Sequence, residues 1–219
     1  MSSGKKTFLF YKFSRKIVEI FFKLFYKTKV YGEKEHFIKG KALIAGNHTS
    51  YFDPPLIGVA WPEIIHYFAR PSLFEKPVLG FLLRSYNVHP LSSRGALGAL
   101  KLLSSFLKQG CKVVIFPEGT RSKEDRIVDM KQGFTMIAQK NDSPIIPAYV
   151  HGAFDIWSCY RKKPKFSGQL ACVFGSPLTW DQFEHLDRKG AQIEMGKAWL
   201  QSMENLKNWY IDGAKGTPP

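Results

Sequence analysis

The N-terminal stretch of the chain combines apolar and cationic side chains with the period of a helix. Projected at about 100° per residue, the charged positions gather in one sector: Lys12, Arg15, Lys16, Glu19 and Lys23. Apolar residues fill the opposite side: Phe10, Phe13, Ile17, Val18, Ile20, Phe21, Leu24 and Phe25. Charges interrupt every apolar run well before the ~20 residues that a spanning helix requires. The pattern therefore predicts an amphipathic helix with a basic face that does not cross a membrane.

Beyond residue 40, short apolar runs alternate with helical patterns. Strands are predicted at residues 41–46, 64–69, 112–116, 144–150 and 168–174. Helices are predicted at residues 94–109, 131–140 and 180–209. Residues 155–167 instead form a basic segment interrupted by a proline, which predicts a loop. Because strands and helices follow one another, crossover connections are expected, and the fold class is α/β, with a mixed, largely parallel sheet flanked by helices.

The charge balance narrows the range of partners. The chain of 219 residues carries 32 Lys and Arg against 18 Asp and Glu, a net charge of +14. Such an excess favours polyanions, namely nucleic acid, an anionic membrane or phosphorylated substrates. The cysteines Cys111, Cys159 and Cys172 are an odd number without a CxxC pair, which argues against a disulfide framework or structural zinc.

The N-terminal helix has two interpretations. It is either an ordinary surface helix that covers the core or a helix that lies in a membrane interface. Four cations against one anion on its polar face, with Phe and Leu opposite, favour the interface. Each cation near an anionic leaflet contributes ~1 kcal/mol, and each buried Phe or Ile contributes ~1.5 to 3 kcal/mol. We therefore expect residues 1–37 to be a membrane-association segment and residues 38–219 to be the α/β domain.

The stretch NHTSYFDP at 47–54 follows the first predicted buried strand. This strand delivers Asn47 and His48 to the carboxyl edge of the sheet, where open α/β folds place their sites. Asp53 and Pro54 predict a helix start, with Asp53 as the cap. Two structural explanations compete with a catalytic one: a buried, satisfied imidazole for His48, and capping alone for Asp53.

A second stretch, VVIFPEGTRS at 113–122, ends another apolar strand at the same predicted edge. Its turn holds Glu118, Gly119, Thr120 and Arg121. A glycine permits close backbone approach, a threonine offers a hydroxyl, and an arginine presents a fork suited to phosphate. The alternative is a Glu–Arg surface pair on an ordinary turn.

Together the two stretches resemble the signatures of the glycerolipid acyltransferases. NHTSYFDP is similar to their NHxxxxD signature, and FPEGTRS at 116–122 matches their second signature without a gap. A weaker similarity joins SPIIPAYV at 143–150 to the family's apolar, proline-containing strand. HPLSSR at 89–94 occupies the place of the family's arginine block, although it is one residue longer and lacks the usual glycine. The resemblance covers residues 38–175.

The resemblance implies transfer of a fatty acyl group from a thioester, of acyl carrier protein or coenzyme A, to the free hydroxyl of 1-acyl-glycerol-3-phosphate. The product is phosphatidic acid, for phospholipid synthesis. His48 would act as general base and Asp53 would orient its imidazole. The implied substrate-binding residues are Arg94 and Arg121 on the phosphate, with Glu118, Gly119 and Thr120 around the acceptor. No covalent acyl-enzyme, cofactor or metal is required.

Membrane residence follows from lipid substrates, so we expect peripheral or monotopic attachment to an anionic membrane on its cytoplasmic face. The residues expected at that surface are Phe10, Lys12, Phe13, Arg15, Lys16, Ile17, Phe21, Lys23, Leu24 and Phe25.

Three alternatives stay open. A sibling acyltransferase would use glycerol-3-phosphate, dihydroxyacetone phosphate or another lysophospholipid. A hydrolase would use His151 and Asp155, although the chain has no G-x-S-x-G nucleophile elbow. A nucleic-acid-binding protein would fit the charge, but no recognised binding motif is present, so we expect no nucleic-acid partner.

Overall fold

The computed structural model describes residues 2–91, 95–127, 130–131 and 133–219. Its strands are β1 (Lys29–Tyr31), β2 (Ala42–Gly46), β3 (Ile65–Ala69), β4 (Val88–Pro90), β5 (Lys112–Ile115), β6 (Ile145–His151) and β7 (Ala171–Phe174). Its helices are α1 (Ser2–Tyr26), α2 (Asp53–Ala60), α3 (Pro77–Ser85), α4 (Gly95–Lys108), α5 (Gly133–Lys140), α6 (Ala153–Trp157) and α7 (Arg188–Ile211). Two short 3-10 helices, η1 (Pro71–Phe74) and η2 (Trp180–Phe183), complete the elements of the described chain.

The described strands form one sheet in the order β1-β7-β6-β2-β5-β3-β4. All neighbouring pairs are parallel except β6 and β7, which are antiparallel. Strand β2 lies at the centre, where Leu43 aligns with Val113 of β5 and with Ile145 of β6. The sheet is therefore mixed and largely parallel, and the α/β fold class is confirmed.

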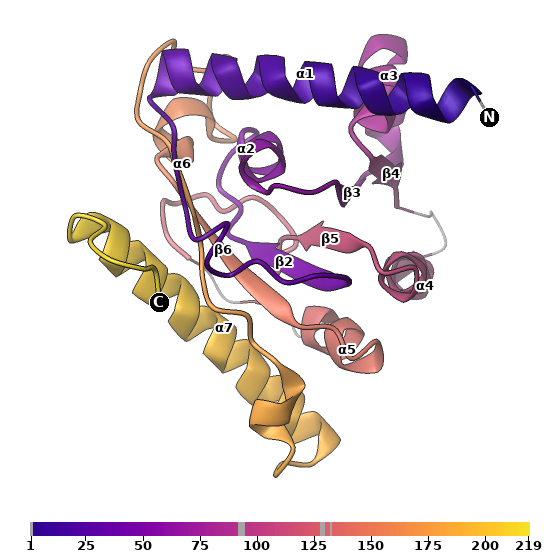
Figure 1. The fold of residues 1–219 in the computed structure, drawn as a ribbon, viewed down its shortest axis with the longest axis vertical. Helices are drawn as coiled ribbons and strands as arrows, with labels where there is room; N and C mark the ends of the chain where they lie inside the picture. Colours follow the sequence, from indigo (N-terminus) through magenta and orange to yellow (C-terminus); the bar gives the residue numbers. More distant parts are fainter. Residues whose placement is uncertain (1, 92–94, 128–129, 132) are drawn as a thin grey trace.

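Helices cover both faces of the sheet (Figure 1). Because successive residues of a strand point to opposite faces, Ile44 packs among side chains from α1, α2 and α6, whereas Leu43 and Ala45 pack among side chains from α4, α5 and α7. Figure 1 shows α1 and α2 on one side of β2 and β5, and α5 and α7 on the other. A strand buried on both faces needs apolar residues at every position, which explains the uninterrupted ALIAG of β2.

Several elements differ from those that the pattern predicts. Strands β1 and β4 have three residues each, too short to give a periodic signal, and neither was predicted. Helix α3 was also missed, and the first residues of the predicted loop at 155–167 belong to α6. The predicted C-terminal helix at 180–209 begins as η2 and continues, after a gap, as the longer α7.

Helix α1 packs against α2, on the side of α2 that faces away from the sheet. No described helix is both long and apolar enough to cross a membrane. The docked side of α1 carries Tyr11, Phe22 and Tyr26, which are buried. Arg15 shares this side, because its guanidinium donates to the carbonyl oxygens of Gly58, Val59 and Trp61 at the end of α2.

A different stripe of α1 faces solvent. Its large apolar members are Phe13, Ile17, Ile20, Phe21, Leu24 and Phe25. The cations Lys16 and Lys23 flank this stripe and both pair with Glu19. The helix thus has three faces instead of the two that the sequence projection predicts. The placement of Arg15 on the free basic face is wrong, because backbone carbonyls of α2 hold its guanidinium. The side chain of Phe10 lies outside the part of the chain whose side chains are described.

Candidate active site

The loop between β2 and α2 leaves the sheet at its carboxyl edge, and Asn47 sets the point of departure. The Asn47 side-chain amide donates to the carbonyl oxygen of Val150 (3.0 Å) and accepts from the Val150 backbone N–H (2.7 Å). These two bonds continue the pairing of β2 with β6 by one step after the backbone of β2 has turned away. His48, the next residue, therefore begins a loop whose base is fixed to the central strands.

His48 and Asp53 form a hydrogen-bonded pair. The distance between His48 Nδ1 and Asp53 Oδ2 is 2.9 Å, and the Asp53 side chain is fully buried. The same oxygen accepts from the backbone N–H groups of Thr49 and Ser50, both at 2.7 Å. Because an ionised carboxylate only accepts hydrogen bonds, Nδ1 is the donor, and Nε2 of the neutral ring keeps its lone pair. This is the tautomer that a general base requires.

The prediction that Asp53 caps the following helix is wrong. The N-cap of α2 is Phe52, which makes no side-chain cap hydrogen bond, and Asp53 is the first helical residue. Its carboxylate turns back and binds the loop that precedes the helix, so capping alone does not account for this residue.

The ring of His48 is also held from its flat side. Phe116, at the end of β5, stacks on the imidazole with ring centroids 4.1 Å apart and an angle of 21° between the planes. The imidazole thus has one nitrogen fixed by Asp53 and one face covered by Phe116. Its side chain is still 19% exposed, so the alternative of a sealed, purely structural histidine is not supported.

The turn after β5 is hydrogen-bonded to the backbone of His48. Glu118 Oε1 accepts from the His48 N–H at 3.0 Å, and the N–H of Ser122 donates to the His48 carbonyl oxygen at 2.6 Å. Gly119 between them has a φ of +74°, a left-handed conformation that favours glycine. The two sequence motifs therefore form one interlocked unit, as their shared position at the sheet edge predicts.

Burial changes the acidity of both carboxyl groups in this unit. Desolvation raises the pKa of Asp53, while the bond from His48 and the two backbone N–H groups oppose that rise. Desolvation also raises the pKa of Glu118 to about 7, against the opposing hydrogen bond from the His48 backbone; the nearby Asp53 charge adds to the rise. Glu118 consequently titrates in the neutral range.

Arg121 lies against the first motif instead of pairing with Glu118. Its guanidinium carbon is 3.6 Å from the ring centroid of Tyr51, which also contacts Trp157 with centroids 4.9 Å apart. Glu118 bonds to the backbone of His48, so the alternative of a Glu–Arg surface pair is wrong. Arg121 Nη1 is shut off from solvent and has no hydrogen-bond partner among the described residues. A phosphate oxygen is the kind of acceptor that this group suits.

The remaining predicted site residues do not all join this unit. Gly119 and Thr120 are exposed beside Arg121, whereas Arg94 lies outside the described residues. His151 contacts the hydroxyl of Tyr149 (3.2 Å) and packs against the ring of Tyr210 at a tilt, and it has no hydrogen bond to Asp155. The hydrolase pairing of His151 with Asp155 is therefore wrong.

Three residues of the site escaped the sequence analysis as functional candidates: Tyr51, Phe116 and Trp157. Tyr51 and Phe116 lie inside the two motifs, at positions where the residue type carries no chemical signal. Their roles depend on which rings meet across loops, and only the three-dimensional arrangement shows this.

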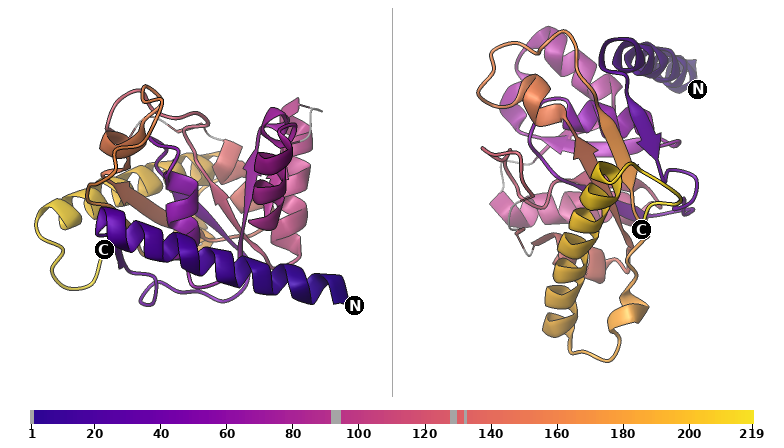
Figure 2. Two further views of the ribbon diagram at one scale, coloured as in Figure 1. Left: turned by 90° about the horizontal axis from the view of Figure 1, so that it is seen from above. Right: turned by 90° about the vertical axis from the view of Figure 1, so that its left-hand side faces the viewer.

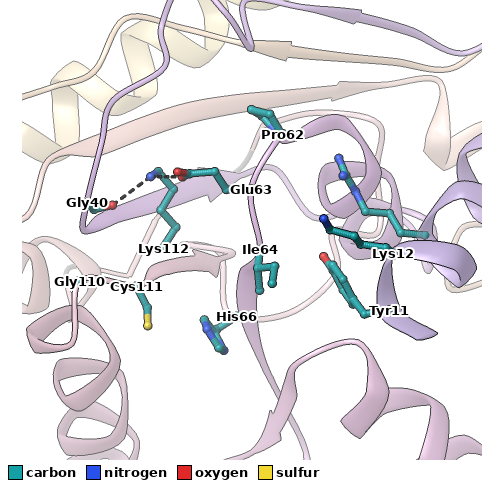
Figure 3. Close-up of a pocket in the computed structure, with 11 residues that line it drawn as sticks. Tyr11, Lys12, Gly40, Pro62, Glu63, Ile64, His66, Gly110, Cys111 and Lys112 are labelled. Carbon is teal, nitrogen blue, oxygen red and sulfur yellow. Dashed lines mark hydrogen bonds and ion pairs between the residues drawn. The ribbon is translucent and has the colours of Figure 1, made fainter. Parts of the chain in front are cut away.

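The opposite edge of the sheet contains a cavity of about 560 Å³ (Figure 3). Residues at the amino ends of β3 and β5 line it, including Ile64, His66 and Lys112, together with Tyr11 and Lys12 from α1. No residue of the two motifs borders this cavity. Among the described residues, no group of three or more His, Cys, Asp and Glu side chains is placed to hold a metal ion.

Comparisons with known proteins agree with this fold. The profile of the acyltransferase family matches residues 27–151. A 1-acyl-sn-glycerol-3-phosphate acyltransferase from Bacillus subtilis (strain 168) is 30% identical over 200 residues, which cover 90% of this chain and 97% of the relative. The enzyme of the same name from Helicobacter pylori is 32% identical over 150 residues, covering 66% of this chain and 62% of the relative.

A longer relative, the chloroplastic BAT2 from Brassica napus, is 30% identical over 158 residues, but the match spans only 46% of its length. The crystal structure of the acyltransferase PlsC from Thermotoga maritima superposes with a TM-score of 0.75 at 23% identity, covering 94% of this chain and 84% of that one. The family match and these relatives show that the chain is an enzyme that transfers acyl groups. The chain belongs to the acyltransferase family, and its curated relatives include several 1-acyl-sn-glycerol-3-phosphate acyltransferases.

Proposed function

We propose that the chain is a membrane-associated enzyme that acylates the free hydroxyl of 1-acyl-glycerol-3-phosphate and produces phosphatidic acid. The donor is an acyl thioester of acyl carrier protein or coenzyme A. The observation that carries the proposal is the interlocked unit of His48, Asp53 and Glu118 with Arg121 beside it. The names of the relatives support the choice of acceptor.

The geometry of His48 suits activation of an alcohol. A hydroxyl is a poor nucleophile at neutral pH, so Nε2 takes its proton while the oxygen attacks the thioester carbonyl, a contribution of ~10² to 10⁴ in rate. The new C–O bond forms, the C–S bond breaks, and the imidazolium returns its proton to the leaving thiolate. Asp53 holds the ring in the required tautomer and stabilises the imidazolium. The acceptor's own hydroxyl is the nucleophile, so no acyl-enzyme intermediate, cofactor or metal takes part.

Arg121 supplies the phosphate contact. Its planar guanidinium is fixed on one face by Tyr51, which leaves its edge to donate to phosphate oxygens. Gly119 and Thr120, exposed on the same turn, border the acceptor, and Glu118 holds this turn against the backbone of His48. Arg94 remains a predicted second cation for the phosphate.

The outer stripe of α1 is the proposed membrane contact, on the cytoplasmic face of an anionic membrane. Its exposed apolar members from the predicted set are Phe13, Ile17, Phe21, Leu24 and Phe25. Lys12, Lys16 and Lys23 lie beside them, whereas Arg15 is left out because it binds α2. Leu24 is 73% exposed, and transferring several such side chains out of water contributes ~1.5 to 3 kcal/mol each. Helix α3, which packs beside α1, adds the exposed apolar residues Val78, Phe81 and Leu82.

The decisive assay offers the purified enzyme 1-acyl-glycerol-3-phosphate and glycerol-3-phosphate side by side, each with both thioester donors. We expect turnover of the first acceptor, and the comparison of donors identifies the carrier. Turnover of glycerol-3-phosphate instead would move the chain to a sibling acyltransferase. Activity that survives exhaustive treatment with EDTA is expected, since the mechanism uses no metal.

Membrane attachment is tested separately by sedimentation with anionic vesicles. Deleting α1 would also remove Phe22 and Tyr26 from the core, so exposed positions are changed instead. The triple change Phe13→Ser, Ile17→Ser and Leu24→Ser should release the protein from vesicles while its thermal unfolding stays close to that of the wild type. Unchanged sedimentation would reject α1 as the anchor.

A further inference from the structure

The basic segment that follows α6 forms an exposed loop with no counter-charge. Residues 159–167 read CYRKKPKFS, and no Asp or Glu occurs between residues 156 and 180. The cations are Arg161, Lys162, Lys163 and Lys165, all exposed. In the described part of the chain, none of the four makes an ion pair or a side-chain hydrogen bond. Two aromatic side chains accompany them into solvent, Tyr160 at 66% and Phe166 at 84% exposure.

The first end of this loop is attached to the catalytic loop. Ser158 forms an isolated β-bridge with Ser50, which lies between His48 and Asp53. The carbonyl oxygen of Trp157 accepts from the Ser50 hydroxyl (2.8 Å) and from the Tyr51 N–H (3.2 Å). The segment that carries the cations therefore starts directly beside the residues that position the catalytic histidine and Arg121.

The second end of the loop is attached to α1. The hydroxyl of Tyr26, the last residue of α1, donates to the carbonyl oxygen of Lys165 at 2.8 Å. The N–H of Lys165 donates to the carbonyl oxygen of Ile156 at 3.0 Å and closes the base of the loop. Figure 1 and the right-hand view of Figure 2 show α1, α3 and this loop at the same end of the molecule, away from the N-terminal half of α7.

We propose that loop 159–167 is a second contact with the anionic membrane and that it holds the mouth of the active site against the lipid surface. The proposal rests on the membrane-resident acceptor of the proposed function. Clustered Lys and Arg with exposed aromatic rings are the chemistry of an anionic lipid interface. The loop is also bound to the last residue of α1, the helix that carries the exposed apolar stripe. With α1 on one side and the loop on the other, a lysophospholipid could pass from the bilayer to His48 without crossing bulk water.

The test compares two charge-matched variants of the full chain. The loop variant combines Arg161→Gln, Lys162→Gln, Lys163→Gln and Lys165→Gln. The control combines Lys108→Gln, Lys140→Gln, Lys189→Gln and Lys197→Gln, exposed positions on α4, α5 and α7. Binding is measured by co-sedimentation with phosphatidylcholine vesicles that contain or lack phosphatidylglycerol, without turnover. Each cation near an anionic surface is worth about fivefold in partition, so the loop variant should bind anionic vesicles at least about 10-fold more weakly than the control. Phe166→Ser should weaken binding further.

The turnover of the same variants locates the effect. The loop variant should lose acyl transfer to lysophosphatidate embedded in vesicles and retain transfer to a short-chain, water-soluble acceptor. Equal vesicle binding by the loop variant and the control would overturn the proposal. Unchanged vesicle binding with a raised KM for an acyl carrier protein donor would also overturn it and assign the loop to that acidic protein. If the wild type acylates no lysophosphatidate while the loop variant still leaves the vesicles, the proposed function fails and the membrane contact stands.

Discussion

The two edges of the sheet differ in how their buried polar groups are hydrogen-bonded. At the amino edge, Lys112 is buried beside the cavity of Figure 3, where its ammonium binds the Gly40 carbonyl oxygen and Glu63 and lies over the ring of Phe37. These partners hold the buried ammonium in a structural role. At the carboxyl edge, Asp53 Oδ1 and Arg121 Nη1 have no partner among the described residues, although their neighbouring atoms are held firmly.

The difference shows that the amino-edge cavity is not the better candidate for chemistry. Its buried lysine is held in closed, structural contacts. The carboxyl edge has an imidazole whose nitrogen is fixed by Asp53, while its ring face and backbone are fixed by the turn after β5. Groups fixed in this way need no reorganisation when a substrate binds, which is the condition for catalysis by positioned acids and bases.

Replacing one histidine at each edge should give the largest difference in kcat between the two regions. His48→Ala removes the proposed general base, and we expect a loss of ~10² to 10⁴ in kcat. His66→Ala changes a half-buried histidine that borders the amino-edge cavity, and it should leave kcat within a few-fold of the wild type. Steady-state acylation of lysophosphatidate measures both, and an equal loss in the two variants would contradict the assignment of the edges.

Lys112→Met should affect stability and spare catalysis. The variant loses a buried hydrogen bond and ion pair at the amino edge, so we expect a cost of about 1 to 3 kcal/mol in the free energy of unfolding. Its kcat per folded molecule should be unchanged. Denaturant unfolding and a turnover assay on the same preparation provide the comparison, with exposed Lys108→Met as the control.

Tyr51→Ala should weaken binding of the phosphate-bearing acceptor. The guanidinium of Arg121 loses the ring that fixes its plane, an interaction worth about 0.5 to 2 kcal/mol. We therefore expect a raised KM for lysophosphatidate with a smaller change in kcat. Tyr51→Phe keeps the aromatic face and should behave like the wild type, so a matching defect in the phenylalanine variant would point to the hydroxyl instead of the ring.

Stability should also depend on pH through Glu118. Its pKa is about 7 in the folded protein against a usual 4.5, so its contribution to stability is fully present below about pH 4.5 and is lost as the pH rises through 7. Glu118→Gln cannot ionise and should gain stability relative to the wild type between pH 5 and pH 8. Thermal unfolding across this range tests the trend. Glu184→Gln, at an exposed position, should show a constant difference, and a flat curve for Glu118→Gln would contradict the buried carboxyl.

The strands that carry the site could be predicted because burial on both faces requires apolar residues along most of β2, β5 and β6. The short edge strands β1 and β4 could not, because three residues give no period and their burial depends on neighbours distant in sequence. The projection of α1 separated charged from apolar positions correctly. It misplaced Arg15 because a helical projection does not show that α2 ends nearby with free carbonyl oxygens.

In the candidate site, too, some features could be predicted from the sequence and others depend on contacts between distant segments. The resemblance to the NHxxxxD signature implied that Asp53 would orient the His48 imidazole, and the two side chains are hydrogen-bonded. The hydrogen bonds from the loop backbone to the Asp53 carboxylate were missed, because Asp before Pro is also a common helix start. The stacking of Phe116 on His48 and of Tyr51 on Arg121 depends on two separate turns meeting in space, for which hydrophobic periodicity has no signal.

The Asn47 side chain takes the place of a peptide group in the sheet. Its amide donates to and accepts from the backbone of Val150, so the hydrogen bonding between β2 and β6 extends by one pair that a side chain supplies. An aspartate has the same shape but no donor, and its oxygen would oppose the Val150 carbonyl oxygen. The position thus tolerates only an amide of this length, and a difference of one nitrogen atom decides whether the chain can bend away from the sheet while the strand beside it stays in register.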